Sequence, residues 1–166
     1  EERRKFIQVL TGPRQCGKTT LAHQVANAIK LPVHFVSADS AIPYGSTWIE
    51  QQWETARTIV KKNTKSGALI VFDEIQKVSG WSEVIKKLWD EDTKDKINLK
   101  VLILGSAPLL IQKGLTESLA GRFELISLSH WSYKEMQNAF GWNLNQYIYF
   151  GAKTAVIHID SGFDRK

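Results

Sequence analysis

Eight residues near the amino end, 12–19, have types and spacing suited to holding phosphate. They read Gly-Pro-Arg-Gln-Cys-Gly-Lys-Thr and match the pattern G-x-x-x-x-G-K-[ST] in full. Gly12 and Gly17 permit backbone angles that other residues resist, so that amide N–H groups can surround phosphate oxygens. We expect Lys18 to reach the β- and γ-phosphates of a nucleotide and Thr19 to offer its hydroxyl to Mg²⁺.

The predicted nucleotide-binding residues are this loop and the threonine after it: Gly12, Pro13, Arg14, Gln15, Cys16, Gly17, Lys18, Thr19 and Thr20. Two interpretations of Arg14 stay open, contact with phosphate or exposure to solvent. Cys16 is expected to be a spacer without a catalytic role.

A pair of acidic residues follows the apolar run at 68–72. A carboxylate at the end of a buried strand is costly unless something pairs with it. We therefore expect Asp73 to hold Mg²⁺, and the adjacent Glu74 to orient and deprotonate an attacking water. The alternative is a carboxylate that merely begins a loop.

Further candidates are each given with their structural alternative. Ser106, after another apolar run, either contacts the γ-phosphate or attacking water, or is an ordinary loop serine. Arg122 is either an arginine finger, on its own nucleotide or a neighbour's, or a salt-bridged arginine. Gln76 either senses the nucleotide or packs in its loop. Trp48 and Trp131 are candidates for stacking on adenine or on a partner.

Apolar strands alternate with helical patterns along the chain, which predicts a mostly parallel sheet covered on both faces. Strands are expected at 6–11, 33–37, 68–73, 100–105 and 123–128, and helices at 18–30, 47–62, 81–90 and 132–140. We also expect short helical turns at 108–120 and either a strand or a loose tail at 155–159.

Helical spacing predicts which residues of these helices share a face. In the first helix they are Leu21, Val25 and Ile29. In the second they are Ile49, Trp53, Ala56 and Val60, with Thr47 and Glu50 as a capping box. In the third they are Ile85, Leu88 and Trp89.

The length and composition predict one globular domain. The net charge is +5, but the charges are spread thinly, with Lys61-Lys62 and Lys86-Lys87 as short pairs, so solvated helix faces are favoured over a nucleic-acid groove. A single cysteine cannot form an internal disulfide. With no signal peptide and no apolar run long enough to span a bilayer, we expect a cytoplasmic protein without membrane contact. The four histidines show no metal-ligand spacing.

Taken together, several segments resemble the prokaryotic AAA-type ATPases over residues 5–150. They are the phosphate loop, the strand end Phe-Asp-Glu-Ile-Gln-Lys, the expected helix from Trp81 to Asp90, Leu-Gly-Ser-Ala, and Leu-Thr-Glu-Ser-Leu-Ala-Gly-Arg-Phe-Glu-Leu. The resemblance implies a P-loop NTPase fold, a three-layer αβα sandwich with sheet order 5-1-4-3-2, in the N-terminal part of a longer bacterial or archaeal ATPase. The segment at 150–154 departs from the family pattern, so the expected ATPase domain is 1–150 and a truncated or altered tail is expected at 151–166.

The resemblance also implies roles for named residues. Lys18 and Thr19 would contact phosphate and Mg²⁺, Asp73 would hold Mg²⁺, Glu74 would be the catalytic base and Ser106 the nucleotide sensor. It raises Arg122 as a candidate finger. The choice of ATP over GTP rests on this resemblance.

The first hypothesis is therefore a magnesium-dependent ATPase. Its hydrolysis of ATP would drive a conformational change in further domains or in a partner, and a second copy of the chain is one such partner. The alternatives are a nucleotide-gated binding module with negligible turnover alone, and a nucleic-acid-dependent motor or clamp. A small-molecule kinase is less favoured, because an adjacent Asp73 and Glu74 suit activated water as the nucleophile.

Overall fold

The described part of the chain, residues 5–29, 31–38, 45–63, 66–106 and 118–151 of a computed structural model, is built on a parallel sheet. Its strands are β1 (Ile7–Thr11), β2 (Val33–Ser37), β3 (Ala68–Asp73), β4 (Leu99–Gly105) and β5 (Phe123–Ser127). They lie in the order β2-β3-β4-β1-β5, and all four pairings are parallel. The predicted order 5-1-4-3-2 is confirmed.

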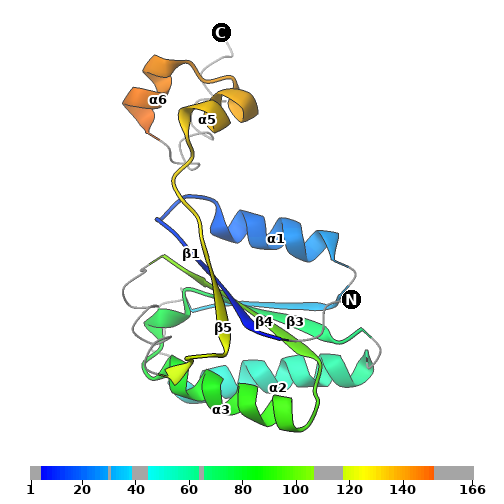
Figure 1. Cartoon of the computed structure of the whole chain (residues 1–166). Coiled ribbons are helices and arrows are strands. Elements are labelled where there is room, and N and C mark those ends of the chain that lie inside the picture. The colour runs from blue at the N-terminus through cyan, green and yellow to red at the C-terminus, as the bar shows by residue number, and fades with distance from the viewer. Residues whose placement is uncertain (1–4, 30, 39–44, 64–65, 107–117, 152–166) are drawn as a thin grey trace.

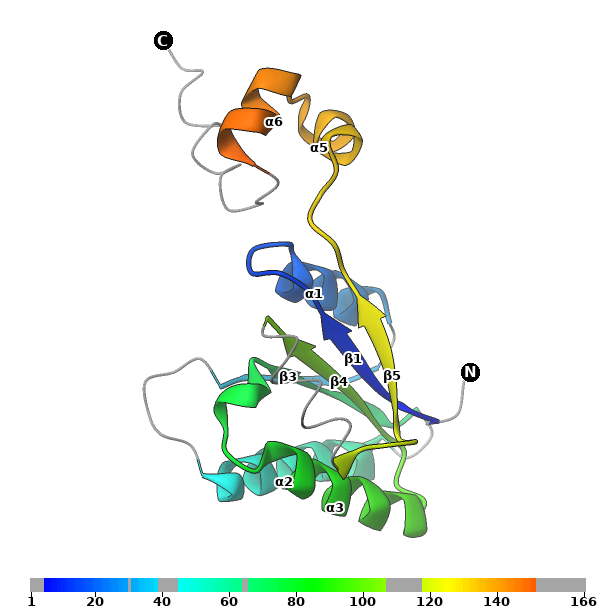
Figure 2. The ribbon, with the colours of Figure 1, turned by 60° about the vertical axis from the view of Figure 1, so that its left-hand side comes forward.

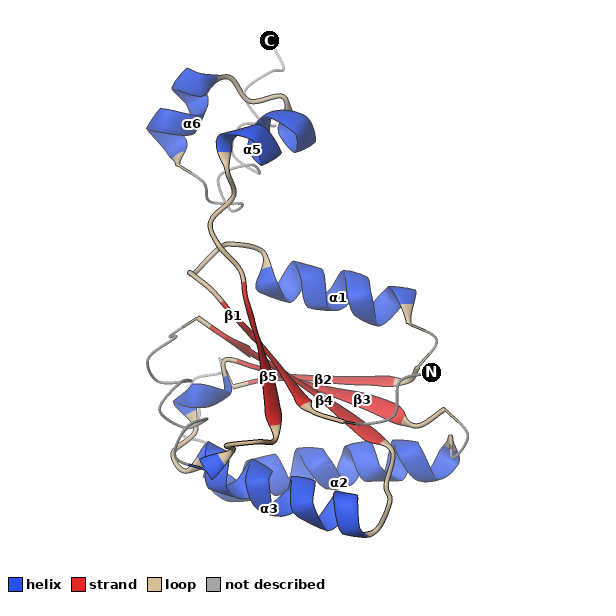
Figure 3. Ribbon diagram, viewed as in Figure 1, coloured by secondary structure: helices blue, strands red, loops and turns tan. Residues whose placement is uncertain are grey.

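Helices cover both faces of this sheet (Figure 1). Helix α1 (Lys18–Ala28) lies on one face, and α2 (Ser46–Lys62) and α3 (Trp81–Lys94) lie on the other (Figure 3). A short 3₁₀ turn, η1 (Ile75–Lys77), connects β3 to α3. Two further helices, α5 (Tyr133–Phe140) and α6 (Leu144–Phe150), lie beyond the end of β5, apart from the three layers (Figure 2). The predicted three-layer sandwich is confirmed.

The core explains why these segments fold as they do. Every residue of β3 is buried, as expected for a central strand covered on both faces. The predicted stripe on α2 is also buried, as are Ile85, Leu88 and Trp89 of α3. These side chains form the larger of two apolar clusters, between the sheet and the α2–α3 layer.

The face under α1 is less completely covered than the helical pattern predicts. Only Lys18 and Ala22 of α1 are buried, whereas Leu21 and Val25 are 37% and 43% exposed. A single helix contacts the sheet here through Ala22, and its larger apolar residues line an open groove beside Phe6 instead. The predicted face of Leu21 and Val25 is therefore only half-buried.

Helix ends differ from the predictions in several places. The capping box of Thr47 and Glu50 is wrong, because α2 begins at Ser46 after Gly45 and has no side-chain cap. Helix α3 runs on to Lys94, and α6 was not predicted at all. Of the turns expected at 108–120 only 118–120 are described, and the segment 151–166 lies outside the described residues except for Gly151.

The strand register brings the carboxyl ends of the sheet into line. Thr11 of β1 lies beside Gly105 of β4 and Ser127 of β5, and Asp73 of β3 lies beside Leu104. The residues that follow β1, β3, β4 and β5 therefore share one edge.

No helix in the described ranges is both long and apolar enough to cross a membrane.

Candidate functional site

The phosphate loop connects β1 to α1 at this edge. Gln15 and Gly17 both have positive φ, 61° and 95°, so the chain turns sharply before the helix. Gly12 passes close to the end of β5: a Cβ there would lie 2.6 Å from the carbonyl oxygen of Leu128. The first glycine is thus required by lack of space, and the second by its backbone conformation.

Lys18 is buried, with 6% of its surface exposed. Its Nζ donates hydrogen bonds to the carbonyl oxygens of Gly12 at 2.9 Å and Pro13 at 2.6 Å. The ammonium is therefore held against the loop by the backbone, which satisfies a buried cation without a carboxylate partner in the described contacts.

Thr19 and Asp73 meet although 54 residues separate them in sequence. The Thr19 hydroxyl donates a hydrogen bond of 2.9 Å to Oδ2 of Asp73, which joins the start of α1 to the end of β3. A hydroxyl and a single carboxylate are oxygen ligands of the kind that Mg²⁺ takes in combination with water and phosphate. The described residues contain no cluster of three or more His, Cys, Asp or Glu side chains that would indicate another metal centre.

Glu74 is held in an unusual conformation directly after β3. Its φ is 55°, in the left-handed region, which costs a non-glycine residue about 1 kcal/mol or more. Its backbone N–H donates to the carbonyl of Leu104 at 3.0 Å. Its Oε2 accepts hydrogen bonds from the Ser106 hydroxyl at 2.8 Å and from Nε2 of Gln76. The carboxylate is thus fixed by two donors from two neighbouring strand ends.

Gln76 has a second feature of interest. Its Oε1 is buried and has no hydrogen-bond partner among the described residues. Buried polar atoms are normally paired with protein or water, so this acceptor beside Glu74 suits an incoming donor such as water.

These side chains line one small cavity, which we call the phosphate cavity. It has a volume of about 200 Å³ and is lined by Arg14, Gln15, Gly17, Lys18, Thr19, Thr20, Glu74 and Ser106. The structure therefore brings together Lys18, Thr19, Glu74 and Ser106, with Asp73 joined through Thr19. Pro13 and Cys16 belong to the same loop but do not line this cavity.

Arg122 lies elsewhere. It precedes β5, at the opposite end of the sheet from the phosphate loop, where Ile7 pairs with Phe123. The length of β5 puts about 15 Å of strand between them. Its guanidinium forms a two-point ion pair with Asp90 of α3, with distances of 2.7 and 3.0 Å. This hydrogen bonding raises the pKa of Arg122.

The two tryptophans proposed for stacking have different surroundings. Trp48 packs against Phe72 at the edge of the core, with ring centroids 6.2 Å apart. Trp131 lies beside the phosphate loop, and its Nε1 donates a 3.1 Å hydrogen bond to the carbonyl of Cys16.

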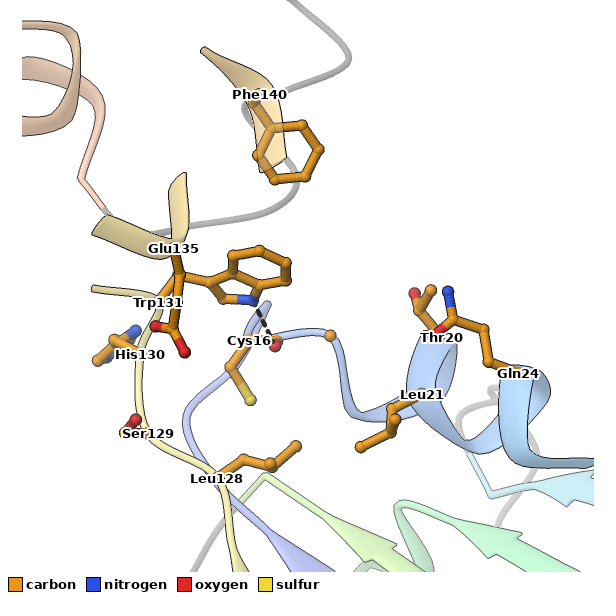
Figure 4. Close-up of a pocket in the computed structure, with 11 residues that line it drawn as sticks. Cys16, Thr20, Leu21, Gln24, Leu128, Ser129, His130, Trp131, Glu135 and Phe140 are labelled. Atoms are coloured by element: carbon orange, nitrogen blue, oxygen red, sulfur yellow. Dashed lines mark hydrogen bonds between the residues drawn. The ribbon is translucent and has the colours of Figure 1, made fainter. Parts of the chain in front are cut away.

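A second cavity lies beside the phosphate loop (Figure 4). The sequence gives little sign of it. Residues after β5, including Leu128 and Trp131, line it together with α1 and α5. The one available signal was the sheet order: β5 lies next to β1, so residues that follow β5 must lie near Gly12.

Comparison with known proteins gives a family. The sequence profile of a family described as an AAA domain matches residues 4–137. An uncharacterised protein of Mycobacterium tuberculosis is 34% identical over 123 residues, which cover 74% of this chain and 25% of that protein. An uncharacterised protein of Haemophilus influenzae is 28% identical over 141 residues, or 81% of this chain and 34% of that protein. The chain thus spans a quarter to a third of the length of these relatives.

Solved structures share the fold. RuvB of Thermotoga maritima, a Holliday junction branch migration motor, has a TM-score of 0.56 at 21% identity, covering 80% of this chain and 41% of RuvB. ORC2 of Aeropyrum pernix, solved with ADPNP and ADP, has a TM-score of 0.58 at 15% identity, covering 82% of this chain and 45% of ORC2. At these identities the likeness concerns the fold alone.

Proposed function

The chain belongs to the AAA domain family, and on that premise we propose that it binds ATP with Mg²⁺ and hydrolyses it to ADP and phosphate. One observation carries the proposal. Lys18, Thr19, Glu74 and Ser106 come from three separate segments, yet they line one phosphate cavity at the carboxyl edge of the sheet. Ligands of parallel α/β proteins bind at this edge.

The loop and the start of α1 would hold the polyphosphate. Gly17 has no side chain to cap α1, so an anion can accept from the amides of the first turn and benefit from the helix dipole. Lys18, now bonded to two carbonyl oxygens, would turn its ammonium toward the β- and γ-phosphates. Arg14, also in the lining, is a second cation for the phosphates.

Thr19 and Asp73 would hold Mg²⁺, since their oxygens are already 2.9 Å apart. When bound, the ion neutralises charge that develops on the phosphoryl oxygens.

Glu74 would act as the general base. A water oxygen attacks the γ-phosphorus, the bond to the bridging oxygen of ADP breaks, and the water proton passes to the Glu74 carboxylate. Ser106 and Gln76 position that carboxylate, and Oε1 of Gln76, which has no partner among the described residues, can accept a hydrogen bond from the same water.

Binding is tested by titrating the chain with ATP and Mg²⁺ in a calorimeter. We expect Lys18→Ala to weaken ATP binding at least about tenfold, because a charge-assisted contact with phosphate is lost. Lys62→Ala, at the exposed end of α2, removes the same charge and should leave binding unchanged. Equal affinities for wild type and Lys18→Ala would contradict the proposal.

A second candidate, a module that turns over ATP only with a neighbour, is favoured by the position of Arg122. Because this residue lies at the far end of β5, it cannot reach the phosphate cavity of its own chain. If it is an arginine finger, it must act on the nucleotide of another copy. Specific activity should then rise with protein concentration.

Mixing two inactive variants tests this second candidate. Arg122→Ala keeps the phosphate cavity but lacks the finger, and Glu74→Gln keeps the finger but lacks the base. Mixed together, they should recover activity that neither shows alone. Full activity of Arg122→Ala alone would exclude the finger and leave the pair with Asp90 as a structural contact.

A further inference from the structure

The phosphate cavity adjoins a larger one, which we call the Trp131 cavity. The Trp131 cavity has a volume of about 510 Å³, within the range of small-molecule sites, and lies between the phosphate loop, α1 and the segment after β5. Gly17 and Thr20 line both cavities. One elongated ligand can therefore occupy both, with a polyphosphate in the first and a larger group in the second.

Trp131 forms one wall of this cavity, and Thr20, Leu21 and Gln24 of α1 lie across from it (Figure 4). The indole is fixed in place because its Nε1 donates to the carbonyl of Cys16 at 3.1 Å. Phe140 meets the indole at a tilt of 45°, with centroids 5.5 Å apart, so it is not stacked flat on the ring. The N–H of the indole is already used, and its main remaining capacity is to stack with another flat ring.

The rest of the lining suits a flat heterocycle. Leu21 and Leu128 supply apolar surface, and Gln24 and Glu135 supply oxygen atoms that can accept from an exocyclic amine. A flat heterocycle with polar edges that is joined through a sugar to a polyphosphate is a nucleotide.

We propose that the base of the bound nucleotide stacks on Trp131. This contact would make the chain bind a nucleotide more tightly than a bare polyphosphate. The proposal rests on the proposed function, because the phosphates must occupy the phosphate cavity. It goes beyond it in assigning the base to a residue outside the phosphate loop.

The test compares two ligands, ATP and inorganic tripolyphosphate, both with Mg²⁺. Trp131→Ala should weaken ATP binding about 5- to 150-fold, the usual effect of losing one base–aromatic stack, and should leave tripolyphosphate binding unchanged. Trp131→Phe keeps a ring and should retain most of the ATP affinity. Trp48→Phe is the matched control, since Trp48 packs against the core beside Phe72, and should bind both ligands as the wild type does.

Tryptophan fluorescence gives a second readout that does not depend on the stability of Trp131→Ala. ATP should quench part of the emission of the wild type and of Trp48→Phe, and this quenching should be absent in Trp131→Phe. Tripolyphosphate should not produce it.

Three results would overturn the proposal. They are unchanged ATP affinity in Trp131→Ala, equal weakening of ATP and tripolyphosphate, and quenching that persists in Trp131→Phe. In each of these cases wild-type binding of ATP would leave the proposed function intact. Failure of the wild type to bind either ligand would instead contradict both.

Discussion

At Gly12 the phosphate loop meets the end of β5. A Cβ there would lie 2.6 Å from the Leu128 carbonyl oxygen and 3.1 Å from the Leu128 Cβ. The Gly12 carbonyl also accepts from Nζ of Lys18. This one residue therefore sets both the packing of the loop on the sheet and the resting position of the lysine.

We predict that Gly12→Ala is destabilising and impairs nucleotide binding. The added methyl must displace backbone rather than a flexible side chain, which costs about 1–3 kcal/mol of unfolding free energy. Urea denaturation and an ATP titration measure the two effects. Gly45→Ala is the control, because no atom of the described residues lies within 4 Å of a Cβ at that position. It should change stability by no more than about 1 kcal/mol, the usual effect at a helix N-cap. Similar behaviour of the two variants would contradict the close approach.

Among the elements, α2 and α3 are joined by a buried acidic residue. Asp92 is 0% exposed, and it accepts from Nε1 of Trp53 at 2.9 Å and from Nε of Arg57 at 2.7 Å. Burial opposes the charge on Arg57, but hydrogen bonds to Glu54 and Glu91 and the charge of Asp92 raise its pKa. The ion pair between Arg57 and Asp92 therefore connects α2 to α3, the two helices that cover one face of the sheet.

Removing one partner should be costly. We predict that Arg57→Ala lowers the free energy of unfolding by about 3 kcal/mol, because the carboxylate of Asp92 stays buried without its cation. Lys87→Ala breaks an exposed pair with Glu50 between the same helices and should cost at most about 1 kcal/mol. Thermal or urea denaturation compares the two. A loss in Arg57→Ala no larger than that in Lys87→Ala would show that Asp92 needs no cation.

Helix α5 begins with a pH-sensitive cap. The backbone N–H and the hydroxyl of Ser132 both donate to Glu135, and these bonds lower the pKa of Glu135 below its ordinary value of 4.5. A lowered pKa in the folded state means that the stabilisation is present above pH 4.5 and is lost as the pH falls through the folded pKa.

We therefore predict that the amino end of α5 loosens only in acid. The amide shift of Ser132, followed by NMR from neutral pH to about pH 3, should titrate with a midpoint below 4.5. Glu135→Gln keeps an acceptor but cannot titrate, so its Ser132 amide should not follow this transition. A wild-type midpoint at or above 4.5 would contradict the cap.

The sequence predicts most elements because their signals are local. Residues 68–72 form a continuous apolar run, and α2 has one apolar stripe; both are buried. Helix α6 is only seven residues long and has no buried stripe, because Leu144, Ile148 and Tyr149 are 53%, 71% and 82% exposed. Only its cap, Asn143 with Gln146, marks the helix in the sequence.

The same contrast holds for the site. The phosphate loop and the acidic pair are each short contiguous motifs, so their residues were predictable. The contact of Trp131 with Cys16 spans 115 residues, and that of Arg122 with Asp90 spans 32. Such contacts depend on strand order and register, which no local pattern contains.

At the scale of the whole molecule, Trp131 links the sheet to the α5–α6 pair. Its side chain contacts the phosphate loop and Phe140 of α5, and its carbonyl accepts from the Tyr147 hydroxyl of α6 at 3.0 Å. A nucleotide in both cavities would therefore touch a residue that joins the two helices to the sheet. On the proposed function, we expect any shape change on turnover to arise at this junction.

The most informative measurement is ATP binding and hydrolysis with Mg²⁺ by the wild type and Glu74→Gln, at protein concentrations high enough for neighbouring copies to meet. We expect both to bind ATP with similar affinity and the turnover rate of Glu74→Gln to fall at least about hundredfold, because only the general base is removed. Equal turnover in both would contradict the role of Glu74. No binding by either would contradict the assignment of the phosphate cavity itself.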